Sequence, residues 1–233
     1  MIGTIYLIPC FLGEDRPDII SDEVKNILLG LDEFIVENAK TARRFLRAVG
    51  YKKNFDTEVT LRELNKHGSN SALQLLENVL LGKNIGIISE AGNPCIADPG
   101  NEIVRYAHKQ NITVVPLAGP SSILLALISS GFNGQLFSFH GYLPIEPIPR
   151  AKKIKQLEEN ARTTGTANVF METPYRNGKL LEDLVKNLNE ETALSIACDL
   201  TLPTQYIGTK TIREWKQTKP DINKRYCVFV IGK

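Results

Sequence analysis

One short stretch of this chain combines the residue types of a ligand-binding loop. S-E-A-G-N-P-C-I-A-D-P-G, residues 89–100, contains two Gly, two Pro and an Asn and follows the apolar run 85–88. Open α/β sheets bind ligands where a buried strand leads through such a turn into a helix, because backbone N–H groups are accessible and no Cβ blocks approach. An ordinary turn closed by Asp98-Pro99 is the alternative interpretation. Residues 89–100 are therefore a candidate binding loop.

A second motif places opposite charges at the end of another apolar run. M-E-T-P-Y-R, residues 171–176, follows a strand-like segment and brings Glu172 and Arg176 close to a Pro. Charged residues at a strand terminus either face a cleft or form a surface ion pair. Met171 either packs in the core or contacts a ligand. Both interpretations of the motif stay open.

The small residues of A-G-P-S-S, 118–122, precede an apolar helical pattern. Ser121 or Ser122 is expected to cap that helix, because a Ser hydroxyl accepts a hydrogen bond from the first-turn N–H groups. A helix N-terminus also attracts anionic groups. The two roles are compatible.

Apolar periodicity predicts alternating strands and helices in two sets. In the first set we expect strands at 4–8, 34–36, 85–89 and 113–115, and helices at 19–31, 41–49, 71–81 and 102–110. In the second we expect helices at 121–131, from 150 onward and at 179–188, and strands at 137–140, 169–171, 194–198, 206–207 and 226–231. The alternation in the first set implies a parallel sheet with helices on its faces. The chain is therefore predicted to be an α/β protein with domains 1–117 and 118–233.

Composition limits the class of protein but does not identify a binding partner. Lys and Arg number 28 against 26 Asp and Glu, so overall charge does not indicate a nucleic-acid binder, although local patches could serve one. The four Cys are widely spaced, which favours reduced, packed thiols over a disulfide framework or a zinc site. The first residues lack the pattern of a signal peptide, and no apolar run approaches the ~20 residues that span a bilayer. We expect a cytoplasmic protein that does not enter a membrane.

Four motifs in order resemble the tetrapyrrole methylase superfamily. They are the sequences 89–100, 118–122 with the following S-G-F, F-H-G-Y-L-P at 139–144, and 171–176. Within that superfamily the chain is most similar to the branch that methylates a ribose 2'-hydroxyl of small-subunit ribosomal RNA. The resemblance runs from Leu7 to Ile231, and four motifs at compatible spacing are far more specific than any one of them.

The resemblance implies two α/β domains with S-adenosylmethionine in the cleft between them, and a homodimer. The donor carries a carboxylate, an ammonium and a sulfonium, which a turn offering both N–H and C=O groups can accommodate. The residues that the resemblance places against the donor are Leu12, Gly13, Ala91, Gly92, Asn93, Pro94, Ile96, Ala97, Asp98, Ser121, Ser122, Tyr142, Met171 and Leu200.

Departures from the family pattern concentrate on the acceptor side. Where the branch has E-D-T-R, this chain has E-N-A-K at 37–40, and where it has R-E-L-T-K, this chain has C-D-L-T-L at 198–202. A ribose hydroxyl is a poor nucleophile, so its methylation benefits from a base or from charge that stabilises the alkoxide. Candidate catalytic residues are Glu37, Lys40, Glu90, Glu172 and Arg176, with Asp199 as a further candidate.

Basic side chains could hold RNA by its phosphates, or could simply form solvated helix faces. They are Arg43, Arg44, Arg47, Lys52, Lys53, Arg150, Lys152, Lys153 and Lys155. The three His residues, at 67, 108 and 140, are too far apart in sequence to suggest a metal site, and we expect no metal.

Three functions remain open from the sequence. The first is S-adenosylmethionine-dependent methylation of small-subunit ribosomal RNA. The second is carbon methylation of a corrin or porphyrin, for which the run Y-L-P-I-E-P-I-P at 142–149 could line an apolar trough. The third is a donor-binding module that has lost catalysis, which the altered acceptor residues permit.

Overall fold

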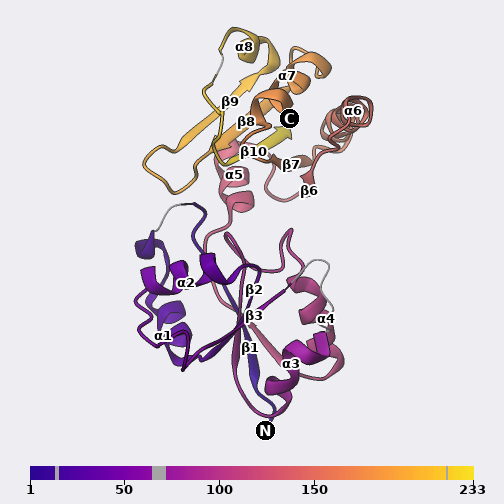
Figure 1. Ribbon diagram of the computed structural model, residues 1–233. Coiled ribbons are helices and arrows are strands. Elements are labelled where there is room, and N and C mark those ends of the chain that lie inside the picture. The colour runs from indigo at the N-terminus through magenta and orange to yellow at the C-terminus, as the bar shows by residue number, and fades with distance from the viewer. Residues whose placement is uncertain (14–15, 65–71, 219) are drawn as a thin grey trace. The chain divides into compact units, whose positions relative to one another are not determined.

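A computed structural model describes residues 1–13, 16–64, 72–218 and 220–233 (Figure 1). The chain forms two compact units, Met1–Ser121 and Ser122–Lys233. The boundary predicted after residue 117 lies shortly before the one between these units. His67 and the predicted start of the helix at 71 lie outside the described residues.

The first unit is built on a parallel sheet of five strands in the order β3-β2-β4-β1-β5. The strands are β1 (Thr4–Ile8), β2 (Glu33–Val36), β3 (Thr60–Glu63), β4 (Ile85–Ile88) and β5 (Thr113–Pro116). Every residue of β2 and β4 is buried, as expected for central strands covered on both faces. The parallel sheet predicted from the alternation of elements is thus confirmed here.

Helices cover both faces of the first sheet (Figure 1). They are η1 (Pro17–Ile19), α1 (Asp22–Gly30), α2 (Ala39–Ala48), α3 (Ala72–Leu80) and α4 (Gly100–Lys109). Neighbouring strand residues point to opposite faces, so Phe34 packs with α1 and α2 while Ile35 packs with α3 and α4. The side chain of Asn38 caps α2 by accepting hydrogen bonds from the N–H groups of Lys40 and Thr41.

The second unit contains a mixed sheet in the order β6-β7-β10-β8-β9. Its strands are β6 (Phe137–Tyr142), β7 (Ala167–Glu172), β8 (Ala193–Cys198), β9 (Tyr206–Thr211) and β10 (Cys227–Gly232). Only β6 and β7 pair in parallel; β10 runs antiparallel to both β7 and β8, and β9 is antiparallel to β8. The ends of β7 and β8 therefore lie beside the start of β10.

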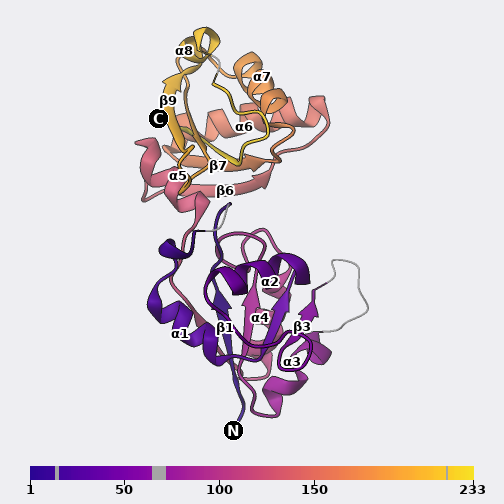
Figure 2. The same ribbon diagram turned by 60° about the vertical axis from the view of Figure 1, so that its left-hand side comes forward.

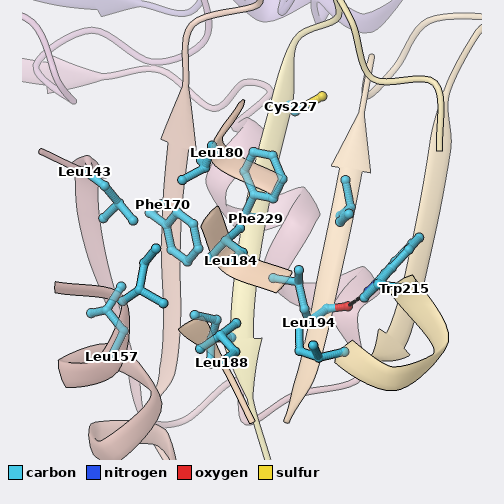
Figure 3. Close-up of a cluster of buried hydrophobic side chains, with 14 of the residues drawn as sticks. Leu143, Leu157, Phe170, Leu180, Leu184, Leu188, Leu194, Trp215, Cys227 and Phe229 are labelled. Carbon is cyan, nitrogen blue, oxygen red and sulfur yellow. Dashed lines mark hydrogen bonds between the residues drawn. The ribbon is translucent and has the colours of Figure 1, made fainter. Parts of the chain in front are cut away.

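One face of the second sheet carries the main core of this unit. The helices are α5 (Ser122–Ser130), α6 (Pro147–Thr164), α7 (Asn177–Asn187) and α8 (Ile212–Gln217). α6, α7 and α8 pack on one face, while α5 contacts β7, β8, β9 and β10 separately from them (Figure 2). Phe170 and Phe229 stack with centroids 5.7 Å apart, and the indole N–H of Trp215 donates to the carbonyl of Leu194 at 2.9 Å (Figure 3).

Besides the short helix η1, a strand and a helix were not expected from the sequence. The strand β3 reads T-L-R-E and has no fully buried residue, so it lacks the apolar run by which its neighbours are recognised. The helix α8 is short, but it begins with a capping box in which Thr211 and Glu214 bond each other's backbone N–H groups. The T-x-x-E spacing at 211–214 is a sequence signal from which the start of this helix could be predicted.

The cysteines are free thiols, as the spacing predicted. Cys198 and Cys227 are partners on adjacent antiparallel strands with their sulfur atoms 2.7 Å apart.

Across the described ranges, every helix is too short or too polar to cross a bilayer.

Candidate functional site

The carboxyl end of the first sheet gathers the loops that the sequence singled out. Because all five strands are parallel, the segments after β1, β2, β4 and β5 emerge on the same side. The adjacent strands β1 and β4 lead to helices on opposite faces, α1 and α4. Between two such strands the connecting chains diverge, and this is where open α/β sheets form ligand crevices.

Backbone hydrogen bonds join the loops after β1 and β4. The N–H of Cys10 donates to the carbonyl of Gly92 at 2.8 Å, and the N–H of Gly92 donates to the carbonyl of Phe11 at 3.2 Å. The hydroxyl of Ser89 also donates to the Gly92 carbonyl at 3.2 Å. Gly92 therefore ties the candidate binding loop to the β1 loop, using the polar groups of its own backbone.

Glycine is required where three of these loops meet. Gly92 has φ +67°, and a Cβ there would lie 3.2 Å from Leu12 and 3.3 Å from the carbonyl oxygen of Pro120. A Cβ on Gly119 would lie 2.1 Å from that of Pro9, closer than any real contact. The loops after β1, β4 and β5 consequently pack backbone against backbone, which larger residues would prevent.

The remainder of the binding loop is shaped by Asp98. Its carboxylate accepts the N–H of Cys95 at 2.8 Å and that of Gly100 at 2.7 Å, at the start of α4. Cys95 and Ala97 both adopt left-handed backbone conformations, with φ of 71° and 62°. Burial, followed by the charge of Asp98, raises the pKa of the Cys95 thiol to about 11, so the thiol stays protonated at neutral pH.

Several side chains of this loop remain available to a ligand. Ile96 is 45% exposed, and Ala91 and Ala97 are also exposed. In the part of the chain that the structure describes, the half-buried Asn93 amide makes no hydrogen bond. Among the other predicted donor contacts, Pro94 and Ser121 are buried, Leu12 is half-buried and Gly13 is exposed.

Three predicted catalytic residues lie together at this end of the sheet. The carboxylate of Glu37 accepts the backbone N–H of Glu90 at 3.1 Å, and the carboxylate of Glu90 accepts the hydroxyl of Thr41 at 2.5 Å. Burial, and then the charges of Glu90 and Glu37, raise the pKa of the Cys10 thiol well above its usual value. Lys40 is exposed in the first turn of α2. Among the described residues, the carboxyl end of the first sheet thus carries the carboxylates of Glu37 and Glu90, with Lys40 at its margin.

The other two predicted catalytic residues form an ion pair in the second unit. The Nε and Nη2 atoms of Arg176 lie 2.9 and 2.6 Å from Glu172 Oε1, which also accepts the N–H of Thr173. The Glu172 side chain is 1% exposed and that of Arg176 is 35% exposed. The surface ion pair considered from the sequence is therefore wrong for Glu172, which is buried while its partner reaches the surface.

The predicted donor contacts of the second unit lie near that pair. Tyr142 and Met171 are partners across β6 and β7, and Tyr142 is exposed. Leu200 is buried just after β8, at the same end of the sheet. Ser122 begins α5.

A second charged pair at this end was not recognised from the sequence. The carboxylate of Asp199 accepts Nε of Arg225 at 2.7 Å, the hydroxyl of Thr204 at 3.0 Å and the N–H of Tyr226 at 3.1 Å. Asp199 has φ +49° and is buried. The pair links the loop after β8 to the start of β10, and because its members are 26 positions apart no local motif contains both.

The structure corrects part of the predicted RNA-binding set. Arg150 is 5% exposed, pairs with Asp183 at 3.3 Å and donates to the carbonyl of Ile145, so it fastens α6 rather than facing solvent. Lys53 forms an ion pair with Asp32. Lys152 and Lys155 are exposed. No cluster of three His, Cys, Asp or Glu within the described ranges could hold a metal ion.

Comparisons with known proteins agree with the resemblance. A model of the Tetrapyrrole (Corrin/Porphyrin) Methylases matches residues 5–216. Ribosomal RNA small subunit methyltransferase I of Haemophilus influenzae is 30% identical over 99% of this chain and 79% of its own length. The Synechocystis protein of that name is 35% identical, covering 86% of this chain and 68% of its own.

The fold is also found among solved structures. The methyltransferase CobJ superposes with a TM-score of 0.63 at 18% identity, covering 99% of this chain and 94% of that one. Both units thus have counterparts in one known architecture. The chain belongs to the tetrapyrrole methylase family and is an S-adenosylmethionine-dependent methyltransferase.

Proposed function

We propose that this protein methylates a ribose 2'-hydroxyl of small-subunit ribosomal RNA. The observation that carries the proposal is the match, over 99% of the chain, to a protein named ribosomal RNA small subunit methyltransferase I. The 2'-hydroxyl as acceptor comes from the branch that the sequence motifs resemble.

The carboxyl end of the first sheet fits the methyl donor. Its charge is negative, from Glu37 and Glu90, and the donor brings a sulfonium and an ammonium that such a site favours. Asn93 offers an amide with no protein partner among the described residues, and Ile96 offers exposed apolar surface beside it. We propose that Gly92 and Asp98 shape this loop and that Ala91, Asn93 and Ile96 contact the donor.

The donor supplies an activated methyl group, so the protein must align the acceptor and remove its proton. Glu90 is the proposed base, because it is exposed and its position is held by Thr41 and by Glu37. Lys40, exposed nearby in α2, stabilises the developing alkoxide. Within the second unit, the buried Glu172 holds the guanidinium of Arg176, whose side chain is 35% exposed.

Nucleoside mass spectrometry tests the proposal. Ribosomal RNA from cells with and without the gene is digested and compared, and the purified protein is incubated with labelled S-adenosylmethionine and small-subunit ribosomal RNA. A 2'-O-methylated nucleoside that requires the gene is the expected result. Methylation of a corrin or porphyrin instead would establish the second function, and donor binding without any transfer would establish the third.

Replacing Asn93 by Ala tests the donor site itself. Removing one hydrogen-bonding partner of a bound ligand costs about 1 to 3 kcal/mol, so affinity for S-adenosylhomocysteine should fall about 5- to 150-fold in calorimetric titration. Asn84→Ala is the matched control, because Asn84 lies before β4 and bonds the N–H of Thr4 at the opposite end of the sheet. Equal affinity in the two variants would remove Asn93 from the site.

Dimerisation and a cytoplasmic location belong to the same proposal. Leu124 and Ile128 of α5 are 49% and 74% exposed, an apolar surface of the kind that subunit contacts cover. Sedimentation at micromolar concentration would show a species of twice the 26.0 kDa chain mass if the protein is a dimer.

A further inference from the structure

Every tyrosine of the second unit lies at one end of its sheet. β6 ends at Tyr142 and β9 begins at Tyr206, while Tyr175 follows β7 and Tyr226 precedes β10. Strand pairing brings these positions together, because β10 and β9 start where β7 and β8 end and Tyr142 lies opposite Met171. Tyr206 is half-buried against the core, whereas Tyr175 is 80% and Tyr226 59% exposed. We call Tyr175 and Tyr226 the tyrosine pair.

The backbone that carries the tyrosine pair is held by hydrogen bonds. Pro174, directly before Tyr175, accepts the N–H of Lys224 on its carbonyl at 3.0 Å, which joins the loop after β7 to the segment before β10. The N–H of Tyr226 donates to the carboxylate of Asp199 at 3.1 Å, and its carbonyl accepts the N–H of Asp199 at 2.8 Å. The exposed rings therefore extend from a fixed support, so binding a ligand costs little backbone entropy.

A guanidinium group accompanies each ring of the pair. Arg176 directly follows one ring in the sequence, and Arg225 directly precedes the other. The carboxylate of Glu172, 1% exposed, holds Arg176, and that of Asp199, 10% exposed, holds Arg225. Aromatic rings and guanidinium planes are the side-chain surfaces on which unpaired nucleic-acid bases stack. The same combination occurs twice at this end of the sheet.

The segments around the tyrosine pair differ from the apolar surfaces of the second unit. Exposed aliphatic side chains such as Ile128 and Ile148 belong to α5 and α6. By contrast, the segments 173–178 and 223–226, which contain the pair, have no Leu, Ile, Val or Met. Tyrosine combines an apolar ring with a polar hydroxyl, and here it is flanked by cations. This chemistry favours a nucleic-acid base over an aliphatic protein surface as the occupant.

We propose that the tyrosine pair stacks on unpaired bases of the ribosomal RNA that carries the acceptor ribose. This inference rests on the proposed function. The strands β7 and β10 are neighbours, and neighbouring strands lie about 4.8 Å apart, so the two rings suit bases one or a few nucleotides apart. Stacking accepts any base, because every base has a π-face. The pair accordingly holds an unpaired segment of RNA without reading its sequence.

The test removes each ring separately, as Tyr175→Ala and Tyr226→Ala. Binding to a labelled single-stranded oligonucleotide of small-subunit ribosomal RNA sequence is measured by fluorescence anisotropy. Each variant should bind about 5- to 150-fold more weakly than the parent, which corresponds to the roughly 1 to 3 kcal/mol that one stacked base contributes. Parent-like affinity in either variant, with ribosomal RNA still methylated, overturns the inference and leaves the proposed function standing.

Two kinds of control separate stacking from other effects of the substitution. Phe137→Ala removes an aromatic ring that is 40% exposed at the start of β6, the opposite end of the same sheet, and it should bind the oligonucleotide like the parent. Tyr175→Phe and Tyr226→Phe keep the rings and should also bind like the parent. A loss in the Phe variants as large as in the Ala variants would assign the effect to the hydroxyl groups and overturn the inference.

An abasic oligonucleotide of the same length shows whether the rings contact bases. The parent should prefer the strand that carries bases, and each Ala variant should lose that preference while binding the abasic strand like the parent. An equal loss on both strands would place the rings against the sugar–phosphate backbone and overturn the inference.

Two further measurements assign the rings to another partner if the inference is wrong. Weaker binding of S-adenosylhomocysteine by either Ala variant would place its ring in the donor site, and a changed sedimentation coefficient would place it in a subunit contact. Either result overturns the inference. If the parent binds S-adenosylhomocysteine but neither binds nor methylates the RNA, the proposed function and the inference both fail.

Discussion

The two units secure the ends of their sheets by different means. At the carboxyl end of the first sheet, loops join through backbone hydrogen bonds of Gly92 and through a contact at Gly119 that admits no Cβ. At the corresponding end of the second sheet, backbone bonds from Asp199 to Tyr226 and from Lys224 to Pro174 are joined by a side-chain link, the Asp199–Arg225 pair.

Strand direction explains the difference. A parallel sheet delivers several strand ends to one side, so the following loops lie close enough for their backbones to pair. In the second sheet the start of β10 lies between the ends of β7 and β8, and the Asp199–Arg225 ion pair fastens the loop after β8 to the segment that leads into β10. Substitutions should therefore damage the first site through backbone conformation and the second through charge.

The largest effect is expected for Gly92→Val. Valine would have to adopt φ +67° and would press on Leu12 and the Pro120 carbonyl, which together cost on the order of 1 to 3 kcal/mol and displace the loop. Affinity for S-adenosylhomocysteine should fall by at least about 100-fold, equivalent to roughly 2.7 kcal/mol.

Gly165→Val is the matched control for that change. Gly165 has a similar φ of +72° at the end of α6, and nothing lies within 4 Å of its Cβ position. The control should lose stability in thermal melts but bind the ligand normally. Parent-like binding by the Gly92 variant would show that the loop is not part of the donor site.

A smaller effect is expected for Asp199→Asn, which keeps a residue that tolerates φ +49° but leaves Arg225 without its counter-charge. The free energy of unfolding should fall by about 2 kcal/mol, less than for a fully buried pair because Arg225 is 21% exposed. Urea denaturation measures the change. Glu159→Gln, in the exposed pair with Arg162, should cause no measurable loss, and equal losses in both variants would contradict this account.

The smallest effect concerns His140 of β6. Burial lowers its pKa below the usual 6.5, with Lys153 adding to the shift and a hydrogen bond to Asn168 opposing it. The unfolded chain therefore binds the proton more readily, so stability is complete above about pH 6.5 and declines as pH falls toward the folded-state pKa. His140→Gln should flatten the stability profile between about pH 5 and 7.5, measured by urea denaturation. An unchanged profile would assign the acid sensitivity to other groups.

Local patterns in the sequence were enough to predict the parallel sheet of the first unit and the family. Fully apolar runs such as Ile85–Ile88 identify central strands, and the Gly- and Pro-rich turn after them identifies a loop that must approach other backbone closely. These signals are local, because each depends on residues adjacent in the chain. The strand β3 could not be predicted in this way, because a half-exposed strand at the edge of the sheet contains no apolar run.

Only the tertiary structure decided which polar residues act together. Asp199 and Arg225 are 26 positions apart and meet because β8 and β10 are neighbours, while Arg150 is buried against Asp183 although its local sequence resembles an exposed basic run. Likewise, the sequence predicts Glu37 and Glu90 as separate candidates, and their contact arises from the adjacency of β2 and β4. Pairing of charges depends on strand order and burial, and neither quantity is encoded in the spacing of residues along the chain.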